Sequence, residues 1–257
     1  MRRPRLSLRR VLPPLAAAYL AAGIGLALPH LADADPDALW HIVNDRCRPN
    51  QEATQSPRPC AEVTAVGGDL RDGYAILKDR CGATQFLLIP TRRIGGIESP
   101  ELAEAPNYFL YAWQARSYTV QRAERHVMPD EIGLTMNSLG GRSQNQLHIH
   151  IDLIRPDVRA ALKAHAKDKL GTWSSVTLVG EPYQVMRVTD LQENNPAKLL
   201  AARLARTGGA MKDQTLAVVG ATFPDGKTGF YILSNDSPHA HSEELQIDHS
   251  DCHFGTT

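Results

Sequence analysis

One segment, residues 137–156 (NSLGGRSQNQLHIHIDLIRP), constrains the fold most, because apolar and polar residues alternate in it directly after a glycine loop. Side chains of a β-strand point alternately to its two faces, so this alternation predicts a strand that faces a core on one side only. The apolar face carries Leu147, Ile149 and Ile151, and the polar face carries Gln146, His148, His150 and Asp152. The segment therefore predicts two imidazoles side by side on a polar strand face.

The loop before this strand contains groups that suit phosphate: Gly140, Gly141, Arg142 and Ser143. Backbone N–H groups in glycine-rich turns can form anion-binding nests. The guanidinium of Arg142 adds a planar cation, and Ser143 adds a hydroxyl. An H-x-H pair also occurs by chance in a chain with 10 histidines, so the motif alone is a hypothesis. Loop and histidines together predict a phosphate-binding site.

The remaining pattern repeats one order of elements, which is strand, strand, helix, strand, strand. A short helix is expected before the first copy, at residues 36–46, and another between the copies, at 157–169. In the first copy the elements are residues 74–78, 85–90, 98–125, 133–136 and the histidine strand; in the second they are 174–179, 183–189, 190–206, 215–222 and 229–234. The last strand of the second copy lacks an H-x-H pair. We infer a duplicated α+β unit with a single active site.

Charge is balanced over the chain, with 28 Lys and Arg against 28 Asp and Glu, so no overall field attracts nucleic acid.

The N-terminal segment has the pattern of a targeting sequence. Five arginines fall within the first ten residues, and an apolar run follows at residues 11–31. This pattern indicates either a cleaved signal peptide, with a weak site at residues 32–34, or an uncleaved anchor, which its length favours. In both cases the positive end stays cytoplasmic, and the chain after residue 35 is exported.

The four cysteines fit an exported protein. Cys47 and Cys60 flank a loop rich in Pro, Asn and Gln that does not order itself easily, and a disulfide there would contribute about 3 kcal/mol. Cys81 and Cys252 either pair with each other or stay free, since sequence does not fix connectivity. A metal site is disfavoured because no C-x-x-C spacing occurs.

The histidine segment resembles the active-site strand of the histidine-triad (HIT) superfamily, which acts on nucleotides at an α-phosphate. Gln146, His148 and His150 stand at the first, second and third triad places, so the first place departs from the pattern. The resemblance extends over most of the chain after the N-terminal segment and is closest to the CDP-diacylglycerol pyrophosphatases. It rests on YAILKD, QFLLIPTRRIGGIESPEL, NYFLYAWQAR, GRSQNQLHIHIDLIRPDVR and EELQIDH.

The resemblance implies hydrolysis of CDP-diacylglycerol to CMP and phosphatidate through a nucleotidyl-histidine intermediate, without metal or other cofactor. His148 is the implied nucleophile, and His150 the residue that contacts the leaving phosphate. The expected substrate-binding residues are Arg93, Asn137, Gly141, Arg142, Ser143 and Gln146. Because Gln146 is not the attacking group, replacing it by His is expected to change the rate only modestly.

The resemblance also implies the architecture. We expect an α+β protein of HIT-like antiparallel sheets with helices, forming two HIT-like units in one chain as an internal pseudo-dimer, preceded by an N-terminal apolar helix. The expected parts are a membrane segment at 1–35, a helix and Cys-bounded loop at 36–66, the active unit at 67–156 and a degenerate unit at 157–257. The expected location is the bacterial inner membrane, crossed once, with the catalytic domain in the periplasm.

Two alternatives stay open at this point. The first is a HIT-type hydrolase or transferase that acts on a soluble nucleotide. The second is a non-catalytic periplasmic module for metal binding or interaction, built on the polar C-terminal tail. The candidate ligands in that tail are His239, His241, His249 and His253 with Glu243, Glu244, Asp248 and Asp251.

Overall fold

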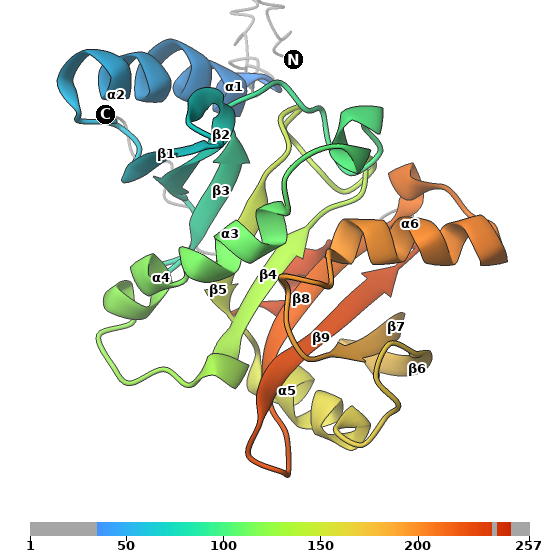
Figure 1. Ribbon diagram of the computed structural model, residues 1–257. Helices are drawn as coiled ribbons and strands as arrows, with labels where there is room; N and C mark the ends of the chain where they lie inside the picture. Colours follow the sequence, from blue (N-terminus) through green and yellow to red (C-terminus); the bar gives the residue numbers. More distant parts are fainter. Residues whose placement is uncertain (1–34, 238–240, 248–257) are drawn as a thin grey trace, which may run out of the picture. The chain divides into compact units, whose positions relative to one another are not determined.

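The protein was analysed in a computed structural model, which describes residues 35–237 and 241–247. These residues form one nine-stranded antiparallel sheet (Figure 1), in the order β1-β2-β3-β5-β4-β8-β9-β7-β6. The strands are β1 (Glu62–Val66), β2 (Asp69–Lys78), β3 (Phe86–Pro90), β4 (Ile132–Met136), β5 (Ile149–Leu153), β6 (Trp173–Leu178), β7 (Glu181–Val188), β8 (Thr215–Thr222) and β9 (Thr228–Asn235).

The helices are short. The α-helices are α1 (Ala38–Ile42), α2 (Arg48–Thr54), α3 (Tyr108–Gln114), α4 (Ser117–Arg122), α5 (Pro156–Leu162) and α6 (Pro196–Thr207). A π-helical turn, η1 (Val43–Cys47), joins α1 to α2. The 3-10 turns are η2 (Pro100–Ala103), η3 (Pro129–Glu131), η4 (Lys163–His165), η5 (Met211–Asp213) and η6 (Ser242–Leu245).

The limits of α6 follow from its sequence. The side-chain oxygen of Asn195 accepts hydrogen bonds from the backbone N–H groups of Ala197 and Lys198, which caps the helix. Pro196 stands at the first helical position, where its missing N–H costs nothing. Gly208 ends the helix with φ of 83°, a conformation that glycine adopts without strain.

The expected fold, HIT-like antiparallel sheets with two HIT-like units as an internal pseudo-dimer, is wrong, because the described residues form a single antiparallel sheet. Strands β4 and β8 pair antiparallel, from Gly133 with Val219 to Met136 with Leu216, so both halves share one sheet. Left apart, these strands would each expose a row of unpaired N–H and C=O groups, and their pairing satisfies both rows. From this pairing outward, the strand order is β4-β5-β3-β2-β1 on one side and β8-β9-β7-β6 on the other. The predicted domain limits at residues 66 and 156 stay a prediction.

The expectation of a transmembrane helix, and with it of a protein that crosses the inner membrane once, is also corrected. Among residues 35–237 and 241–247, no helix is long and apolar enough to cross a membrane. The longest of them, α6, has 12 residues, whereas a span needs about 20 apolar ones. The predicted apolar helix fell on residues 1–35, of which residues 1–34 lie outside the described part of the chain.

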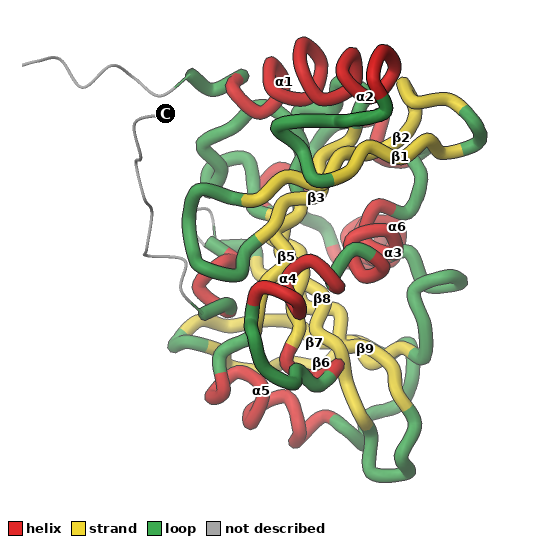
Figure 2. Tube along the Cα trace, turned by 90° about the vertical axis from the view of Figure 1, so that its left-hand side faces the viewer, coloured by secondary structure: helices red, strands yellow, loops and turns green. Residues whose placement is uncertain are grey.

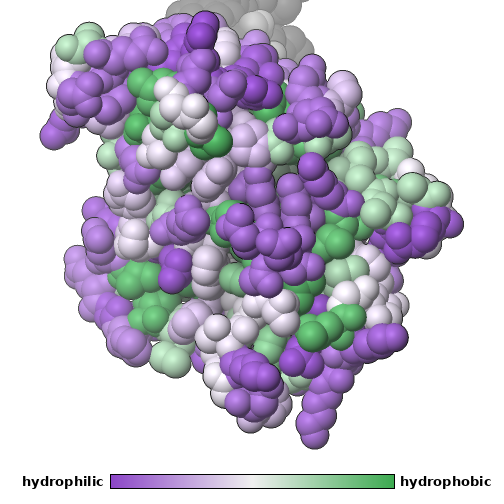
Figure 3. Space-filling view, in the orientation of Figure 1, coloured by the Kyte–Doolittle hydropathy of each residue, from purple (hydrophilic) through white to green (hydrophobic). Residues whose placement is uncertain are grey.

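One face of the sheet is covered by α3, α4 and α6, which lie in front of the strands in Figure 1. The apolar residues of this face belong to the largest core cluster and include Leu134, Ile149 and Ile151. Tyr108 and Ala112 of α3 are buried against it. On the outer surface in this orientation, hydrophobic residues form small patches among hydrophilic ones (Figure 3).

The other face of the sheet carries two separate apolar clusters. One lies on β1, β2 and β3 with η1, and the other lies on β7, β8 and β9 with α5. Helices α1 and α2 lie at one end of the sheet and α5 at the opposite end (Figure 2). Strands β5 and β4 stand between the two clusters in the sheet order, and here the same face carries Thr135, His150 and Asp152. A polar strip therefore divides the apolar surface at the histidine strand.

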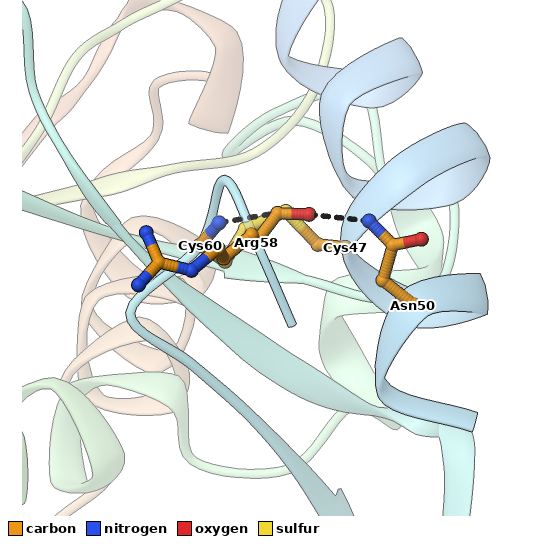
Figure 4. Close-up of a disulfide and its surroundings, with 4 residues drawn as sticks. All are labelled: Cys47, Asn50, Arg58 and Cys60. Atoms are coloured by element: carbon orange, nitrogen blue, oxygen red, sulfur yellow. Dashed lines mark hydrogen bonds between the residues drawn. A yellow bond between two sulfur atoms is a disulfide. The ribbon is translucent and has the colours of Figure 1, made fainter. Parts of the chain in front are cut away.

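A disulfide joins Cys47 in η1 to Cys60 (Figure 4), as predicted, and is called the N-terminal disulfide below. The loop that it closes is more ordered than expected, because residues 48–54 form α2. The amide of Asn50 donates to the carbonyl of Arg58 at 2.6 Å across this loop. Cys81 is disulfide-bonded as well, and Cys252 lies outside the described residues.

Candidate active site

The two histidines of the motif lie side by side. His150 is in β5, and His148 immediately precedes the strand, which begins at Ile149. Their ring centroids are 4.9 Å apart, with 66° between the ring planes. Leu147 and Ile149, on the opposite face, belong to the core, so the predicted alternation is confirmed. The polar face is not open, however, because His148 and His150 are only 9% and 6% exposed.

The hydrogen bonding of His148 fixes which ring nitrogen carries the proton. Its Nδ1 lies 2.7 Å from the carbonyl oxygen of Gln146. A carbonyl only accepts, so Nδ1 is the donor and Nε2 keeps a lone pair. Burial, reinforced by the charge of His150, lowers the pKa of His148 to about 4. His148 is therefore neutral at pH 7, as a nitrogen nucleophile must be.

His150 has the opposite electrostatic environment. Its Nε2 lies 2.8 Å from Oε1 of Glu243, and its Nδ1 lies 3.6 Å from Oδ2 of Asp79. Burial disfavours the charged ring, but the negative charge of Glu243, with those of Asp79 and Asp152, outweighs it and raises the pKa of His150. The side-chain nitrogen of Gln85 lies 3.0 Å from Nδ1 of His150 and donates to the side-chain oxygen of Gln246 at 3.4 Å.

Glu243 is a site residue that the sequence analysis missed, because it assigned this residue to a possible metal-binding tail. The amide of Asn137 donates to the same Oε1 at 2.6 Å. Burial alone would raise the pKa of Glu243, but the charge of His150 and the hydrogen bonds lower it to about 2. The only sequence signal for this placement was the segment EELQIDH, which belongs to the resemblance.

The segment that carries Glu243 is held by several other contacts. Both the backbone N–H and the hydroxyl of Ser242 donate to Oδ1 of Asn137, each at 2.9 Å. Gln246 donates to the carbonyl of Gly133 at 2.9 Å and accepts from the hydroxyl of Thr135 at 3.2 Å. The N–H of Ile247 donates to Leu153 at 2.9 Å. Residues 241–247 thus lie along β4 and β5, beside the histidines.

Gln146, at the first triad place, is fully buried and has a structural role. Its side-chain nitrogen donates to the carbonyls of Pro90 and Arg92, at 3.0 and 2.9 Å, and its oxygen accepts from the N–H of Ile94 at 3.4 Å. These bonds fix the end of β3 against the strand that carries the histidines. The backbone carbonyl of Gln146 is also the partner of His148. Gln146 therefore connects the two segments that shape the site.

Hydrogen bonds within the glycine loop already use the backbone N–H of Gly141. The N–H of Gly141 lies 3.2 Å from the carbonyl and 3.1 Å from the hydroxyl of Ser138, and Ser143 is exposed. The guanidinium of Arg142 binds both carboxylate oxygens of Glu98, at 2.6 and 2.7 Å. Its positive charge contributes to the low pKa of His148, after burial and the charge of His150. Arg142 is thus electrostatically coupled to the histidine pair.

Arg93 is placed differently from the other predicted residues. Its guanidinium pairs with the carboxylate of Asp37 and lies 5.3 Å from the ring centre of Trp40. It therefore contacts the α1 region, and within the described residues no contact joins it to either histidine. The neighbouring Ile94 does reach the site, since its carbonyl accepts from the N–H of Leu147 at 2.7 Å.

The alternative of a metal-binding or interaction module depends on the polar C-terminal tail. Most of its candidate ligands lie outside the described residues, namely His239, Asp248, His249, Asp251 and His253. Across residues 35–237 and 241–247, no group of three or more His, Cys, Asp or Glu is arranged to hold a metal ion.

The fold and site together define an α+β protein with one antiparallel sheet and a buried histidine pair of unequal basicity. Residues 34–256 match the family model described as CDP-diacylglycerol pyrophosphatase. A protein of Yersinia pestis with the name CDP-diacylglycerol pyrophosphatase is 40% identical over 253 residues, which covers 94% of this chain and 93% of that protein. The chain belongs to the CDP-diacylglycerol pyrophosphatase family, and the family prediction is confirmed.

Proposed function

We propose that the chain hydrolyses the pyrophosphate bond of CDP-diacylglycerol and releases CMP and phosphatidate. The observation that carries the proposal is the unequal basicity of the paired histidines. His148 is kept neutral with a lone pair on Nε2, while His150, 4.9 Å away between ring centres, is held toward its charged form. A nucleophile and a proton-bearing cation side by side are what displacement at a pyrophosphate needs.

The reaction proceeds in two displacements. Nε2 of His148 attacks the cytidylyl phosphorus, a phosphorus–nitrogen bond forms, and the bond from that phosphorus to the phosphatidate oxygen breaks. The positive charge of His150 stabilises the negative charge that develops on the leaving phosphate. Water then attacks the same phosphorus and the phosphorus–nitrogen bond breaks. One hydrogen of the water stays on the new oxygen of CMP, the other passes to solvent as a proton, and CMP leaves with the neutral His148 restored.

Substrate oxygens would be held by residues around the histidines. Arg142 supplies a cation whose guanidinium is oriented by two hydrogen bonds to Glu98. Gly141 and Ser143 flank it in the same loop, and Asn137 lies against the partner of His150. Arg93 would have to leave Asp37 before it could bind phosphate.

We also infer that the family belongs to the histidine-triad superfamily. His148 and His150 occupy the second and third places of its motif, immediately before and within β5, and their rings are adjacent. Gln146 replaces the first histidine and supports the site through hydrogen bonds to backbone groups of residues 90–94.

The test is the intermediate itself. Purified protein is incubated briefly with CDP-diacylglycerol labelled in the cytidylyl phosphate, in detergent and with chelator, and quenched in alkali. Label should remain on the protein, vanish on acid treatment, and be absent from His148→Ala. Soluble CDP-alcohols run in parallel separate a lipid pyrophosphatase from a hydrolase of soluble nucleotides. Inversion of configuration at the cytidylyl phosphorus would refute the two-step scheme, even with His148 essential.

A further inference from the structure

We propose that Glu243 is a positioning residue that holds His150 as a cation beside His148, the proposed nucleophile. The inference rests on the proposed function and adds a group to it from the far end of the chain. Glu243 touches His150, rather than the reacting atoms, through the 2.8 Å contact between its Oε1 and Nε2 of the ring.

The position of Glu243 is set without the help of its own charge. The preceding residue, Ser242, is held by two hydrogen bonds to Asn137, and Gln246 is held by Gly133 and Thr135. The segment would therefore stay in place if residue 243 were neutral. The amide of Asn137 fixes the oxygen that faces the ring, because it donates to that same Oε1. The carboxylate thus has a fixed orientation as well as a charge.

The charged and polar groups around His150 come from four segments of the chain. Asp79 follows β2, at 3.6 Å from Nδ1, and Asp152 lies two residues along β5. His148 adds positive charge only when protonated, and Gln85 contributes a neutral amide. Glu243 is the nearest anion and the one that contacts Nε2. Removing its charge should therefore affect His150 more than any other single change among these groups.

A structural role alone would give a different result. If Glu243 merely fastened the tail, its replacement would lower stability or activity by the same factor at every pH. If it holds the charge of His150, the replacement removes a buried opposite charge, which typically shifts a pKa by about 1–3 units. Activity would then be lost selectively at high pH, by about 10- to 1000-fold, and would recover as the pH falls.

Glu243→Gln is the test, because glutamine keeps the shape and the oxygen that accepts from Asn137. Two readouts are measured on the full chain: the titration of His150 by NMR in the unliganded protein, and kcat/KM for CDP-diacylglycerol from pH 5 to 9. We expect both the NMR pKa and the basic limb of the kinetic profile to move to lower pH. Glu244→Gln is the matched control. It removes the same charge at the next residue, whose side chain makes no hydrogen bond or ion pair within the described part of the chain.

An unchanged pKa of His150 in Glu243→Gln would overturn the proposal, as would a loss of activity that is equal at all pH values. If this variant fails to fold, Glu243→Asp must lower the same pKa by a smaller amount, because it withdraws the charge by one methylene. An unaltered pKa there would also overturn the assignment. Should the wild-type protein not hydrolyse CDP-diacylglycerol, the proposed function fails, while the NMR titration still decides the role of Glu243.

Discussion

Replacement of Gln146 tests how far the histidine pair depends on its buried support. Because the resemblance implies that Gln146 is not the attacking group, Gln146→His is expected from the sequence to change the rate modestly. The structure changes this expectation, because the glutamine side chain makes three hydrogen bonds, to the carbonyls of Pro90 and Arg92 and from the N–H of Ile94. A histidine ring has two nitrogens and cannot reproduce two donations from one amide nitrogen.

The magnitude follows from the groups left unpaired. At a fully buried position, each backbone group that loses its partner costs about 1–3 kcal/mol, and at least one carbonyl or N–H is stranded. Gln146→His should therefore destabilise the protein by about 2–4 kcal/mol. For a domain of this size that corresponds to a melting temperature lower by roughly 4–16 °C. Because the carbonyl of Gln146 holds the ring of His148, kcat should fall together with stability.

Thermal unfolding and steady-state hydrolysis of CDP-diacylglycerol measure the two effects. Gln146→Glu is a matched variant, since it keeps the shape but cannot donate when ionised, and it should be destabilised at least as strongly. Asn145→Asp makes the same chemical change at the adjacent exposed residue and should have little effect. A Gln146→His protein with wild-type melting temperature and rate would refute the reasoning.

Three further predictions concern the site and its surroundings. The pH profile of kcat/KM should fall at low pH as His148 becomes protonated near its pKa of about 4, and at high pH as His150, whose pKa is raised, loses its proton. In Glu243→Gln the acidic limb should not move to higher pH, because the negative charge of Glu243 raises the pKa of His148; a shift to higher pH would contradict the assignment. Gly96→Ala should destabilise the protein by about 1–3 kcal/mol and raise KM, because the new Cβ would lie 2.1 Å from Nη1 of Arg142. Gly95→Ala is the control, since the atom nearest to its new Cβ is 3.2 Å away. Equal effects of the two substitutions on KM would contradict this prediction. Reduction of the N-terminal disulfide should lower the free energy of unfolding by about 3 kcal/mol, and denaturant titration with no change would argue against it.

The local sequence pattern was enough to predict those features of the protein that depend only on residues close together in the sequence. The alternation in residues 146–152 gave the two faces of β5, because side-chain direction in a strand has a period of two residues. Tyr108 and Ala112 both face the core because side chains four residues apart lie on the same face of a helix. Cys47 and Cys60 are 13 residues apart, close enough for their pairing to be predicted.

Tertiary structure alone decided the contacts between distant segments. Strand β4 pairs with β8 about 80 residues later in the sequence, and no local pattern distinguishes this single sheet from two separate ones. Likewise, nothing near Glu243 in sequence shows that its carboxylate lies 2.8 Å from His150. The charge state of each histidine depends on burial and on such distant charges. The sequence therefore predicted two rings side by side, but only the folded chain lowers the pKa of one and raises the pKa of the other.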